Sequence, residues 1–491
     1  MEEQKKTPKV YITTVGTSPE AVFNPLWYLV EVYDWVPDRV YLLWNDDVRE
    51  QLEKVKKLIK RLSNAYGVRI SVHAGEEERF SEENPVEFRE KVVSLIGSLK
   101  HDGHEVIVDI TPGRKFMSAL LLGAAIVKNA DEVTYLHLDD WRDYVGKLLF
   151  EIPMVKQRLF MREDLTGKKG TATLGTRRRE DSSKEIPVER EKLMAVLDSL
   201  YIDGFKRFPL KVGSRTIGDV TLGETAKLRV SDFIDISVEL HGGHTMVKEA
   251  MIAGGMAKFR NWEELVSLVR RLKGDGRPLY IGFDTNALYF RVPSKILGEK
   301  RFYSSGNLIF DFVYSDEVSV EVGRHLNKKL PHRRELGIYS NQPVPKARLA
   351  SLGRVELNKL RNLGAERADS RENAQGDTKI ALDYKTFAKV KHANVLVITL
   401  DEGAYSEMDA LKGTGLIPFK LEWDFDFGDT LEGTWEDLRD TLYTLAVTLG
   451  EVSFAGYKLY GIWHGKGSKD WEKERVRLAK FEYGRILRML G

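Results

Sequence analysis

Apolar strand-like runs alternate with helical patterns over residues 9–150 of this 491-residue chain. The strand-like runs are residues 10–15, 39–44, 69–74, 105–110 and 133–138. The helical patterns between them are residues 19–32, 48–66, 85–99 and 115–128. Strands that are apolar along their whole length are typical of a parallel sheet with helices on both faces. The alternation therefore predicts an α/β fold that begins with a doubly wound, Rossmann-like domain.

The pattern changes twice further along the chain. Residues 166–184 are polar, and with Arg177, Arg178 and Arg179 they indicate an exposed linker. A β-rich stretch at 208–240 lies between helical patterns at 188–200 and 262–272. An α/β pattern returns over 277–424, with strands expected at 279–283, 395–399 and 418–422 and helices at 317–329, 348–363 and 378–391. The tail favours helices at 435–449 and 469–490 around a strand-like stretch at 452–463.

These changes predict four consecutive domains. They are an N-terminal doubly wound domain (1–165), a linker and β-rich connecting region (166–275), a second α/β domain (276–425) and a C-terminal helical extension (426–491).

Composition excludes several classes of function. The chain has no cysteine, so it has no disulfide, thiolate zinc site or cysteine nucleophile, which fits a cytoplasmic protein. A net charge of +2 means that contact with nucleic acid must come from local basic patches. Charged residues make up 31% of the chain and glutamine occurs five times, a bias typical of thermophiles. No membrane span or secretory signal is expected.

Two strand-to-helix loops near the N-terminus carry small and polar residues. They are Thr13-Thr14-Val15-Gly16-Thr17-Ser18-Pro19 and Asp109-Ile110-Thr111-Pro112-Gly113-Arg114-Lys115. In a doubly wound fold such loops line the crevice at the carboxyl edge of the sheet, where helix N-termini attract phosphate. Asn45 and Asp46 follow the second strand and are placed to contact a base or ribose. The loops predict a nucleotide or phosphate site. The alternative is that their residues only form turns and bind no ligand.

This pair of loops resembles the signature loops of CARF domains, the sensor modules of type III CRISPR systems, over about residues 8–160. The resemblance implies a homodimer that binds a cyclic oligoadenylate, with cyclic tetra-adenylate favoured, across its two-fold axis. Some CARF domains also cleave their ligand, so ring nuclease activity stays open. The expected ligand-binding residues are Gly16, Thr17, Ser18, Asn45, Thr111, Gly113, Arg114 and Lys115.

Four carboxylates in the second half of the chain are Asp284, Glu321, Asp377 and Asp401. Each stands where a strand or helix would present it. Mg²⁺ or Mn²⁺ prefers several hard oxygen ligands and keeps open positions for phosphate. The series therefore predicts a site for divalent cations and hydrolysis of a phosphodiester. Acids at strand ends and helix starts are also common as caps. For any single one of the four acids, capping is therefore the alternative to metal binding.

The same acids lie in motifs that resemble PIN-type nucleases. The motifs are Ile281-Gly282-Phe283-Asp284-Thr285-Asn286, Ser315-Asp316-Glu317-Val318-Ser319-Val320-Glu321, Gly376-Asp377-Thr378-Lys379 and Val397-Ile398-Thr399-Leu400-Asp401. The intervals between them are longer than in minimal PIN domains. The resemblance implies an endoribonuclease acting on single-stranded RNA, with the four acids as catalytic and metal-binding residues. Glu317 and Asp316 remain alternatives to Glu321, and Asp383 to Asp377. Thr285, Asn286 and Thr399 could orient the acids.

Other signals are weaker. No arginine lies five to seven positions before any of the ten histidines, which argues against a HEPN ribonuclease. The basic run 324–329, with 332–334 after it, either holds substrate phosphates or is a solvated helix end. The alternation of Glu422, Asp424 and Asp426 favours a solvated face of a strand. His464 lies in a glycine-rich turn, which favours a structural role.

We therefore expect a cyclic-oligoadenylate-activated, metal-dependent nuclease of type III CRISPR defence. A ring nuclease and a ligand-responsive regulator that binds nucleic acid without cleaving it are the alternatives.

Overall fold

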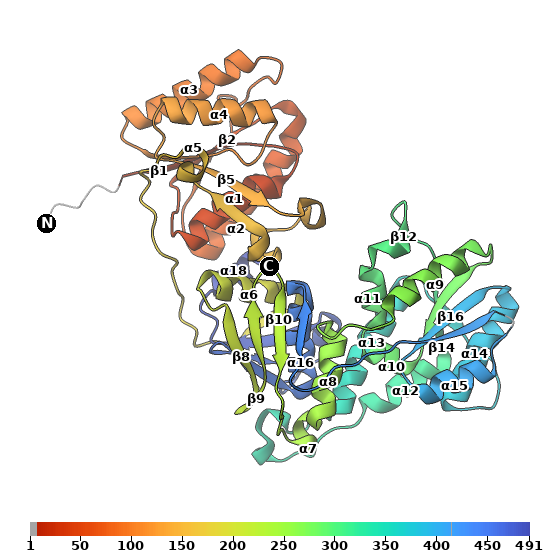
Figure 1. The fold of residues 1–491 in the computed structure, drawn as a ribbon. Coiled ribbons are helices and arrows are strands. Elements are labelled where there is room, and N and C mark those ends of the chain that lie inside the picture. Colours follow the sequence, from red (N-terminus) through yellow and green to blue (C-terminus); the bar gives the residue numbers. More distant parts are fainter. Residues whose placement is uncertain (1–6, 414) are drawn as a thin grey trace. The chain divides into compact units, whose positions relative to one another are not determined.

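The computed structural model describes residues 7–413 and 415–491, and its fold is mixed α/β, as predicted. The chain forms two compact units (Figure 1). Unit 1 comprises Met1–Ser182, Met194–Gly204 and Phe481–Gly491, and unit 2 comprises Ser183–Leu193 and Phe205–Lys480. The chain thus passes between the units four times instead of forming four consecutive domains. No helix of the described residues is long and apolar enough to cross a membrane.

Unit 1 is built on a six-stranded sheet in the order β3-β2-β1-β4-β5-β6. The strands are β1 (Lys9–Thr14), β2 (Arg39–Leu43), β3 (Ser71–His73), β4 (Glu105–Asp109), β5 (Glu132–Leu138) and β6 (Gln157–Phe160). The first five are parallel, and β6 runs antiparallel to β5. The helices are α1 (Pro19–Val32), α2 (Arg49–Tyr66), α3 (Pro85–His101), α4 (Lys115–Val127), α5 (Arg162–Thr166), α6 (Met194–Ile202) and α18 (Gly484–Leu490). The predicted doubly wound domain is confirmed, with element ends within three residues of those expected.

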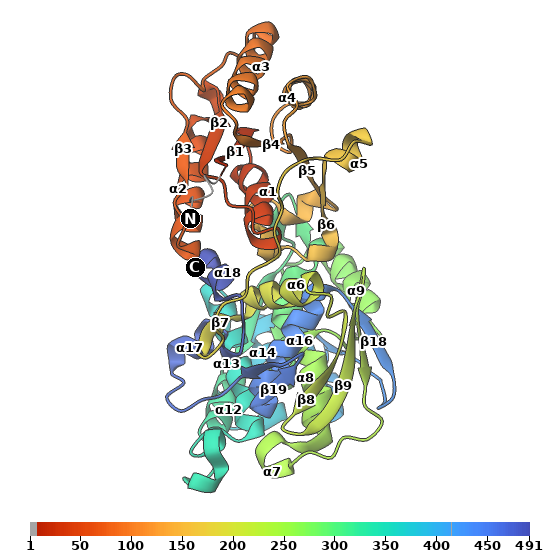
Figure 2. The same ribbon diagram turned by 90° about the vertical axis from the view of Figure 1, so that its left-hand side faces the viewer.

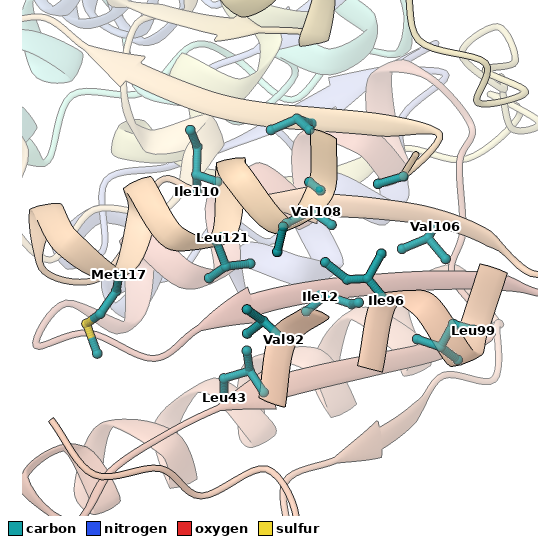
Figure 3. Close-up of a cluster of buried hydrophobic side chains, with 14 of the residues drawn as sticks. Ile12, Leu43, Val92, Ile96, Leu99, Val106, Val108, Ile110, Met117 and Leu121 are labelled. Carbon is teal, nitrogen blue, oxygen red and sulfur yellow. The ribbon is translucent and has the colours of Figure 1, made fainter. Parts of the chain in front are cut away.

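Helices cover both faces of this sheet. On one face α3 and α4 pack over β1 and β4, and Figure 3 shows their side chains meeting in a core that includes Ile12, Val92, Ile96, Val108 and Leu121. Helices α1 and α2 lie on the opposite face (Figure 1). Burial from both sides explains why β4 is apolar along most of its length and buried at every position.

The segment expected to be an exposed linker contains one buried arginine. The side chain of Arg177 is 7% exposed and pairs with Glu31 at 2.6 Å and Asp203 at 3.2 Å. Glu31 is fully buried on α1 and also pairs with Arg485 at 2.7 Å. Because a buried carboxylate is costly without paired cations, the linker prediction is wrong for Arg177. The neighbouring Arg178 and Arg179 are more than half exposed, as expected.

Unit 2 contains an eight-stranded antiparallel sheet in the order β18-β10-β9-β8-β19-β20-β21-β7. Its strands are β7 (Ile186–Glu189), β8 (Arg207–Val212), β9 (Arg215–Leu222), β10 (Ala226–Val230), β18 (Thr430–Gly433), β19 (Glu451–Phe454), β20 (Tyr457–Tyr460) and β21 (Arg475–Ala479). Helices α7 (Val238–His241), α8 (Gly243–Gly254), α16 (Trp435–Leu449) and α17 (Ser468–Glu472) pack with this sheet or with one another, whereas α9 (Trp262–Gly274) contacts the 3₁₀ turn at Lys300–Phe302. The β-rich stretch at 208–240 and the helices at 262–272 and 435–449 are confirmed.

The tail beyond residue 425 differs from the helical extension expected there. Strands β18 to β21 complete the sheet begun by β8 to β10, so the tail and the connecting region share one sheet. The helix expected at 469–490 is instead α17, β21 and α18. In β21 the buried Val476 and Leu478 alternate with arginines, and pairing with β20 and β7 outweighs the helix propensity of those charged residues. Likewise, the helix expected at 188–200 is the end of β7, a 3₁₀ turn at Arg190–Leu193 and α6.

The second sheet of unit 2 has five parallel strands in the order β15-β14-β11-β16-β17. They are β11 (Leu279–Phe283), β14 (Asp311–Ser315), β15 (Glu366–Ala368), β16 (Asn394–Thr399) and β17 (Leu416–Lys420), with a small hairpin of β12 (Tyr303–Ser304) and β13 (Asn307–Leu308). The helices are α10 (Thr285–Tyr289), α11 (Val292–Gly298), α12 (Asp316–Leu326), α13 (Pro345–Asn362), α14 (Gly376–Lys391) and α15 (Glu402–Ala410). The three expected strands and three expected helices are confirmed. The short strands β14 and β15 were not anticipated.

Candidate functional site

The two predicted loops of unit 1 lie against each other at the carboxyl ends of β1 and β4. These strands are neighbours at the point where the strand order reverses, the usual ligand position in such sheets. The Thr14 hydroxyl donates to the Pro112 carbonyl at 3.0 Å. A methyl group on Gly16 would lie 3.1 Å from the amide nitrogen of Gly113. Gly113 itself has φ +95°, so both glycines are required by the close approach of the loops.

Asp109 is buried beneath the second loop. Its carboxylate accepts hydrogen bonds from the hydroxyls of Thr13 (3.2 Å), Thr111 (2.7 Å) and Thr134 (3.1 Å), and burial raises its pKa to about 7 despite these bonds. The Thr111 hydroxyl also accepts from the Leu136 amide at 2.8 Å. Thr111, predicted to contact ligand, therefore uses its hydroxyl inside the fold.

Glu82, which the sequence analysis missed, joins two predicted ligand residues. It accepts from Asn45 Nδ2 at 2.5 Å and pairs with Arg114 at 2.8 Å. Asn45 is 5% exposed, and its Oδ1 has no hydrogen-bond partner among the described residues. Glu82 gave no signal in the sequence because it stands in a loop that holds four other glutamates.

The remaining predicted residues lie at the mouth of the crevice. Thr17 and Lys115 are exposed, and Lys115 is the first residue of α4. Ser18 precedes α1, and its side chain makes no capping hydrogen bond. The N–H groups at the starts of α1 and α4 and the exposed Arg114 guanidinium are suited to a phosphate-bearing ligand.

The four acids of unit 2 lie at the carboxyl edge of its parallel sheet. Asp284 follows β11 and Asp401 follows β16, two neighbouring strands at the reversal of strand order. Glu321 is on α12, and Asp377 is in the first turn of α14. Folding therefore brings these residues to one edge from segments up to 117 positions apart, as the sequence predicts.

Asp284 is the most buried of the four, with 2% exposure. Its carboxylate accepts from the Thr285 amide at 2.6 Å and from the Thr399 hydroxyl at 3.0 Å. Burial, and then repulsion from Asp377 and Glu321, raises the pKa of Asp284 to about 7. The Thr285 hydroxyl also donates to Glu321 at 2.6 Å. As predicted, both threonines orient acids: Thr399 orients Asp284, and Thr285 orients Glu321.

Neighbouring charges separate Glu321 from its alternatives. Glu317 is buried and pairs with Arg324 at 2.9 Å, and Asp316 pairs with Arg367 at 2.9 Å. Both alternatives are therefore neutralised by arginines outside the cluster.

Asp377 and Asp383 also differ in whether a cation neutralises them. Asp383 is fully buried, pairs with Lys379 at 2.9 Å and accepts from the Ser315 hydroxyl at 2.7 Å, so it has a structural role. The pKa of Asp377 is raised by burial and then by Glu321 and Asp401. Asp377 therefore lies among other acids, whereas Asp383 is paired with a lysine.

Asp401 and Glu407 complete the cluster on α15. Asp401 is exposed, and its side chain caps the helix by accepting from the Ala404 amide at 3.0 Å. Glu407 contributes to the raised pKa of Asp377 and accepts from the Thr378 hydroxyl at 3.3 Å. Glu407 was missed because, in sequence, it is one acid among three on a polar helix.

Tyr384 of α14 holds the strand ends beneath the acids. Its hydroxyl donates to the Phe283 carbonyl at 2.7 Å and accepts from the amides of Phe283 (3.1 Å) and Ser315 (3.2 Å). A methyl group on Gly282 would lie 2.6 Å from the Tyr384 ring, so this glycine admits the ring. The Asp284 backbone is thereby set between β14 and β16.

The cluster has no cationic partner in residues 7–413 and 415–491: no ion pair there involves Asp284, Glu321, Asp377 or Asp401. Nor does that part of the chain contain three or more His, Cys, Asp or Glu side chains arranged to hold a metal ion. Asp284, Glu321 and Asp401 each accept a hydrogen bond from a threonine or from a helix N-terminus. The four carboxylates are electrostatic neighbours but do not form a closed coordination shell.

No protein-family model matches the chain, and no curated protein matches its sequence. Among solved structures, Can2 from Sulfobacillus thermosulfidooxidans in complex with cyclic tetra-adenylate is 10% identical, covers 84% of this chain and 93% of its own, and has a TM-score of 0.23. A type III CRISPR defence DNA nuclease activated by cyclic oligoadenylate is 12% identical, covers 90% of this chain and 70% of its own, and also has a TM-score of 0.23. At these values the likeness is too weak to define the fold or activity of this chain.

Proposed function

We propose that the protein is a divalent-metal-dependent nuclease for single-stranded RNA, activated by a cyclic oligoadenylate in type III CRISPR defence. One observation carries the nuclease assignment: four carboxylates from distant segments share one sheet edge without a cationic partner. Mutual repulsion in such a cluster favours binding of a cation. The order of the motifs, which resembles that of PIN-type nucleases, supports the same assignment.

The donor set fits Mg²⁺ or Mn²⁺, since all four groups are hard carboxylate oxygens. Asp284, Glu321, Asp377 and Asp401 would hold the ion, which supplies Lewis acidity toward a phosphodiester. Thr399 keeps the Asp284 carboxylate in place, and Thr285 does so for Glu321. Asp377 and Asp401 are less buried than Asp284.

The activation half of the proposal rests on unit 1. Two helix N-termini, exposed Arg114 and Lys115 and the unpartnered Asn45 oxygen offer a phosphate-bearing ring several donors and one acceptor. A homodimer would double these contacts across a two-fold axis. Activation requires that the ligand bind one state of the protein more tightly than another.

The test is cleavage of a fluorescent single-stranded RNA with Mn²⁺, with and without cyclic tetra-adenylate. Wild-type protein should cleave only with both. Asp284→Asn should lower the rate at least about 100-fold, the scale of a lost transition-state contact, while cyclic tetra-adenylate still binds. The matched control is Asp316→Asn, an acid nearby in sequence that pairs with Arg367 outside the cluster and should keep most activity.

Retained cleavage by Asp284→Asn would place the active site elsewhere. Cleavage that ignores cyclic tetra-adenylate would remove activation from the proposal. Conversion of cyclic tetra-adenylate to linear products by Asp284→Asn, without RNA cleavage by wild-type protein, would favour a ring nuclease.

A further inference from the structure

Unit 2 contains a cavity of about 410 Å³ that the proposed chemistry does not use. It lies between the end of α12, the middle of α13 and residues 464–472, which include α17. Figure 2 shows α12, α13 and α17 within the same part of the unit, and α13 contacts both of the other helices. A volume of this size is typical of sites for small organic groups. Its apolar walls are Leu326, Pro343, Val355 and Trp471.

The polar lining of the cavity is rich in side-chain amides. Asn327, Asn341, Gln342 and Asn358 line it, and their side chains take part in none of the hydrogen bonds among the described residues. Gln342 is only 8% exposed and is one of the lining residues. An amide presents a donor and an acceptor side by side, which is the pattern that pairs with the edge of a nucleobase.

Cations outnumber acids around the cavity. Lys329, Arg354 and Lys466 line it, against Glu472 as the one carboxylate in that lining. Lys329 and Arg354 are exposed, and within residues 7–413 and 415–491 neither has an acidic partner within 4.0 Å. Lys466 is held by the carbonyls of Gly461 (2.6 Å) and Arg475 (3.0 Å). Lys329 and Arg354 therefore remain available to an anion at the rim.

One helix links this cavity to the acidic cluster. Glu321 lies in the middle of α12, and Leu326, its last residue, lines the cavity. Five residues of α-helix span about 7.5 Å along the axis. Lys328 and Lys329, which belong to the basic run noted in the sequence, follow Asn327 at the end of α12. The cavity and Glu321 are therefore separated by little more than one helical turn along the axis of α12.

We propose that this cavity binds one nucleotide of a single-stranded nucleic acid, with the amides contacting the base and Arg354 and Lys329 the adjacent phosphate. That the cavity positions a strand for cleavage rests on the proposed nuclease function. That it binds the strand does not depend on that function. The combination of an apolar wall, amide edges and rim cations matches a nucleotide better than a plain phosphate, which needs no apolar wall.

The test measures binding of a fluorescein-labelled single-stranded RNA by anisotropy, using full-length protein in EDTA so that cleavage does not interfere. The variants are Arg354→Ala and Asn358→Ala, both at solvent-accessible positions of α13, where truncation should not disturb folding. Each should weaken binding roughly tenfold. Arg354→Ala should also lower the slope of log Kd against log salt by about 1, as expected for one lost phosphate contact.

The matched control is Arg271→Ala, on α9 of the same unit; this exposed arginine has no ion pair among the residues that the structure describes, and its loss should change neither affinity nor slope. Unchanged binding by both α13 variants would overturn the proposal. Equal losses with duplex RNA would also overturn it, because a duplex cannot insert a base. The same variants are also tested with single-stranded DNA. Weaker binding of both RNA and DNA, or of RNA alone, supports the proposal, and weaker binding of RNA alone would also show selectivity for ribose.

Cyclic tetra-adenylate is titrated in the same assay because it also carries nucleotides. Competition that disappears in Arg354→Ala would assign the cavity to the activator and overturn the substrate assignment. If wild-type protein binds RNA through Arg354 but does not cleave it with Mn²⁺, the cavity proposal stands and the nuclease proposal fails.

Discussion

At the scale of single residues, the acids of unit 2 differ in what neutralises them. Glu317 and Asp383 are buried beside Arg324 and Lys379, whereas Asp284 is buried beside other acids and two threonines. Burying a carboxylate without a cation costs free energy, and such costs concentrate at functional sites. The position of Asp284 is maintained by the backbone, which Tyr384 anchors.

Removal of the Tyr384 hydroxyl should destabilise unit 2. Tyr384→Phe leaves the buried amides of Phe283 and Ser315 without an acceptor, so the free energy of unfolding should fall by about 2–3 kcal/mol. Urea denaturation followed by tryptophan fluorescence would measure it. Tyr280→Phe, which loses a single bond to the partly exposed Glu366, should cost less than about 1 kcal/mol, and equal losses in the two variants would contradict this account.

The buried Asp109 should make the stability of unit 1 depend on pH. Its folded pKa of about 7 lies above the unfolded value of about 4, so the folded form keeps a proton that the unfolded chain has lost. This contribution to stability is fully present below about pH 4 and is lost as the pH rises to 7. Asp109→Asn should remove a decline of a few kcal/mol over that range, measured by urea denaturation at several pH values. The same decline in both proteins would show that Asp109 is ionised throughout.

At the scale of elements, the packing of two helices in unit 2 depends on a glycine. Helices α8 and α16 pack along each other, and a methyl group on Gly254 would lie 2.3 Å from the Thr441 Cα. No rearrangement of side chains relieves a contact with backbone, so the helices would have to separate. The Thr444 hydroxyl, which donates to the Ala250 carbonyl at 2.7 Å, tightens the same contact.

Two glycines at the ends of helices provide a matched comparison. Gly254→Ala should lower the free energy of unfolding by about 2–3 kcal/mol through overpacking. Gly274→Ala, at the last residue of α9 with no atom within 4 Å of the added methyl, should raise it by up to about 1 kcal/mol through helix propensity. Chemical denaturation of both variants tests the contrast, and a stabilised Gly254→Ala protein would refute the close packing.

At the scale of the whole molecule, buried ion pairs join distant parts of the chain within unit 2. Glu474 pairs with Arg291 at 2.6 Å and with Arg190 at 3.0 Å, and Arg190 pairs with Asp440 at 2.6 Å. Burial opposes ionisation of Glu474, but Arg291 and Arg190 hold its pKa at about 2. This network explains why Ser183–Leu193, which contains Arg190, belongs to unit 2 although the chain leaves that unit directly afterwards.

Breaking this network should be costly. Glu474→Gln leaves two buried guanidinium groups short of negative charge, so the free energy of unfolding should fall by about 3–5 kcal/mol. Asp235→Asn, which breaks a pair with Arg215 that is more than half exposed on both sides, should change it by less than about 1 kcal/mol. Thermal denaturation of the two variants provides the comparison, and a small effect of Glu474→Gln would show that solvent already screens the network.

Periodicity in the sequence was sufficient to predict the doubly wound domain, the strand before Asp284 and the convergence of four acids at a sheet edge. These features are set by local patterns and by the rule that parallel strands end on the same side. The choice of Glu321 over Glu317 depended on Arg324, and that of Asp377 over Asp383 on Lys379, which only the packed helices reveal. Glu82, Glu407 and the buried Arg177 carry no local signal at all.

The sequence by itself determined which segments are strands and helices over most of the chain and which residues could bind a nucleotide or a cation, because both depend on neighbours within a few positions. Only the tertiary structure decided that 183–193 and the tail complete a sheet with β8 to β10, and which acids remain without a cation. Strand partners and charge neutralisation arise from contacts between residues hundreds of positions apart, and these contacts exist only in the folded chain.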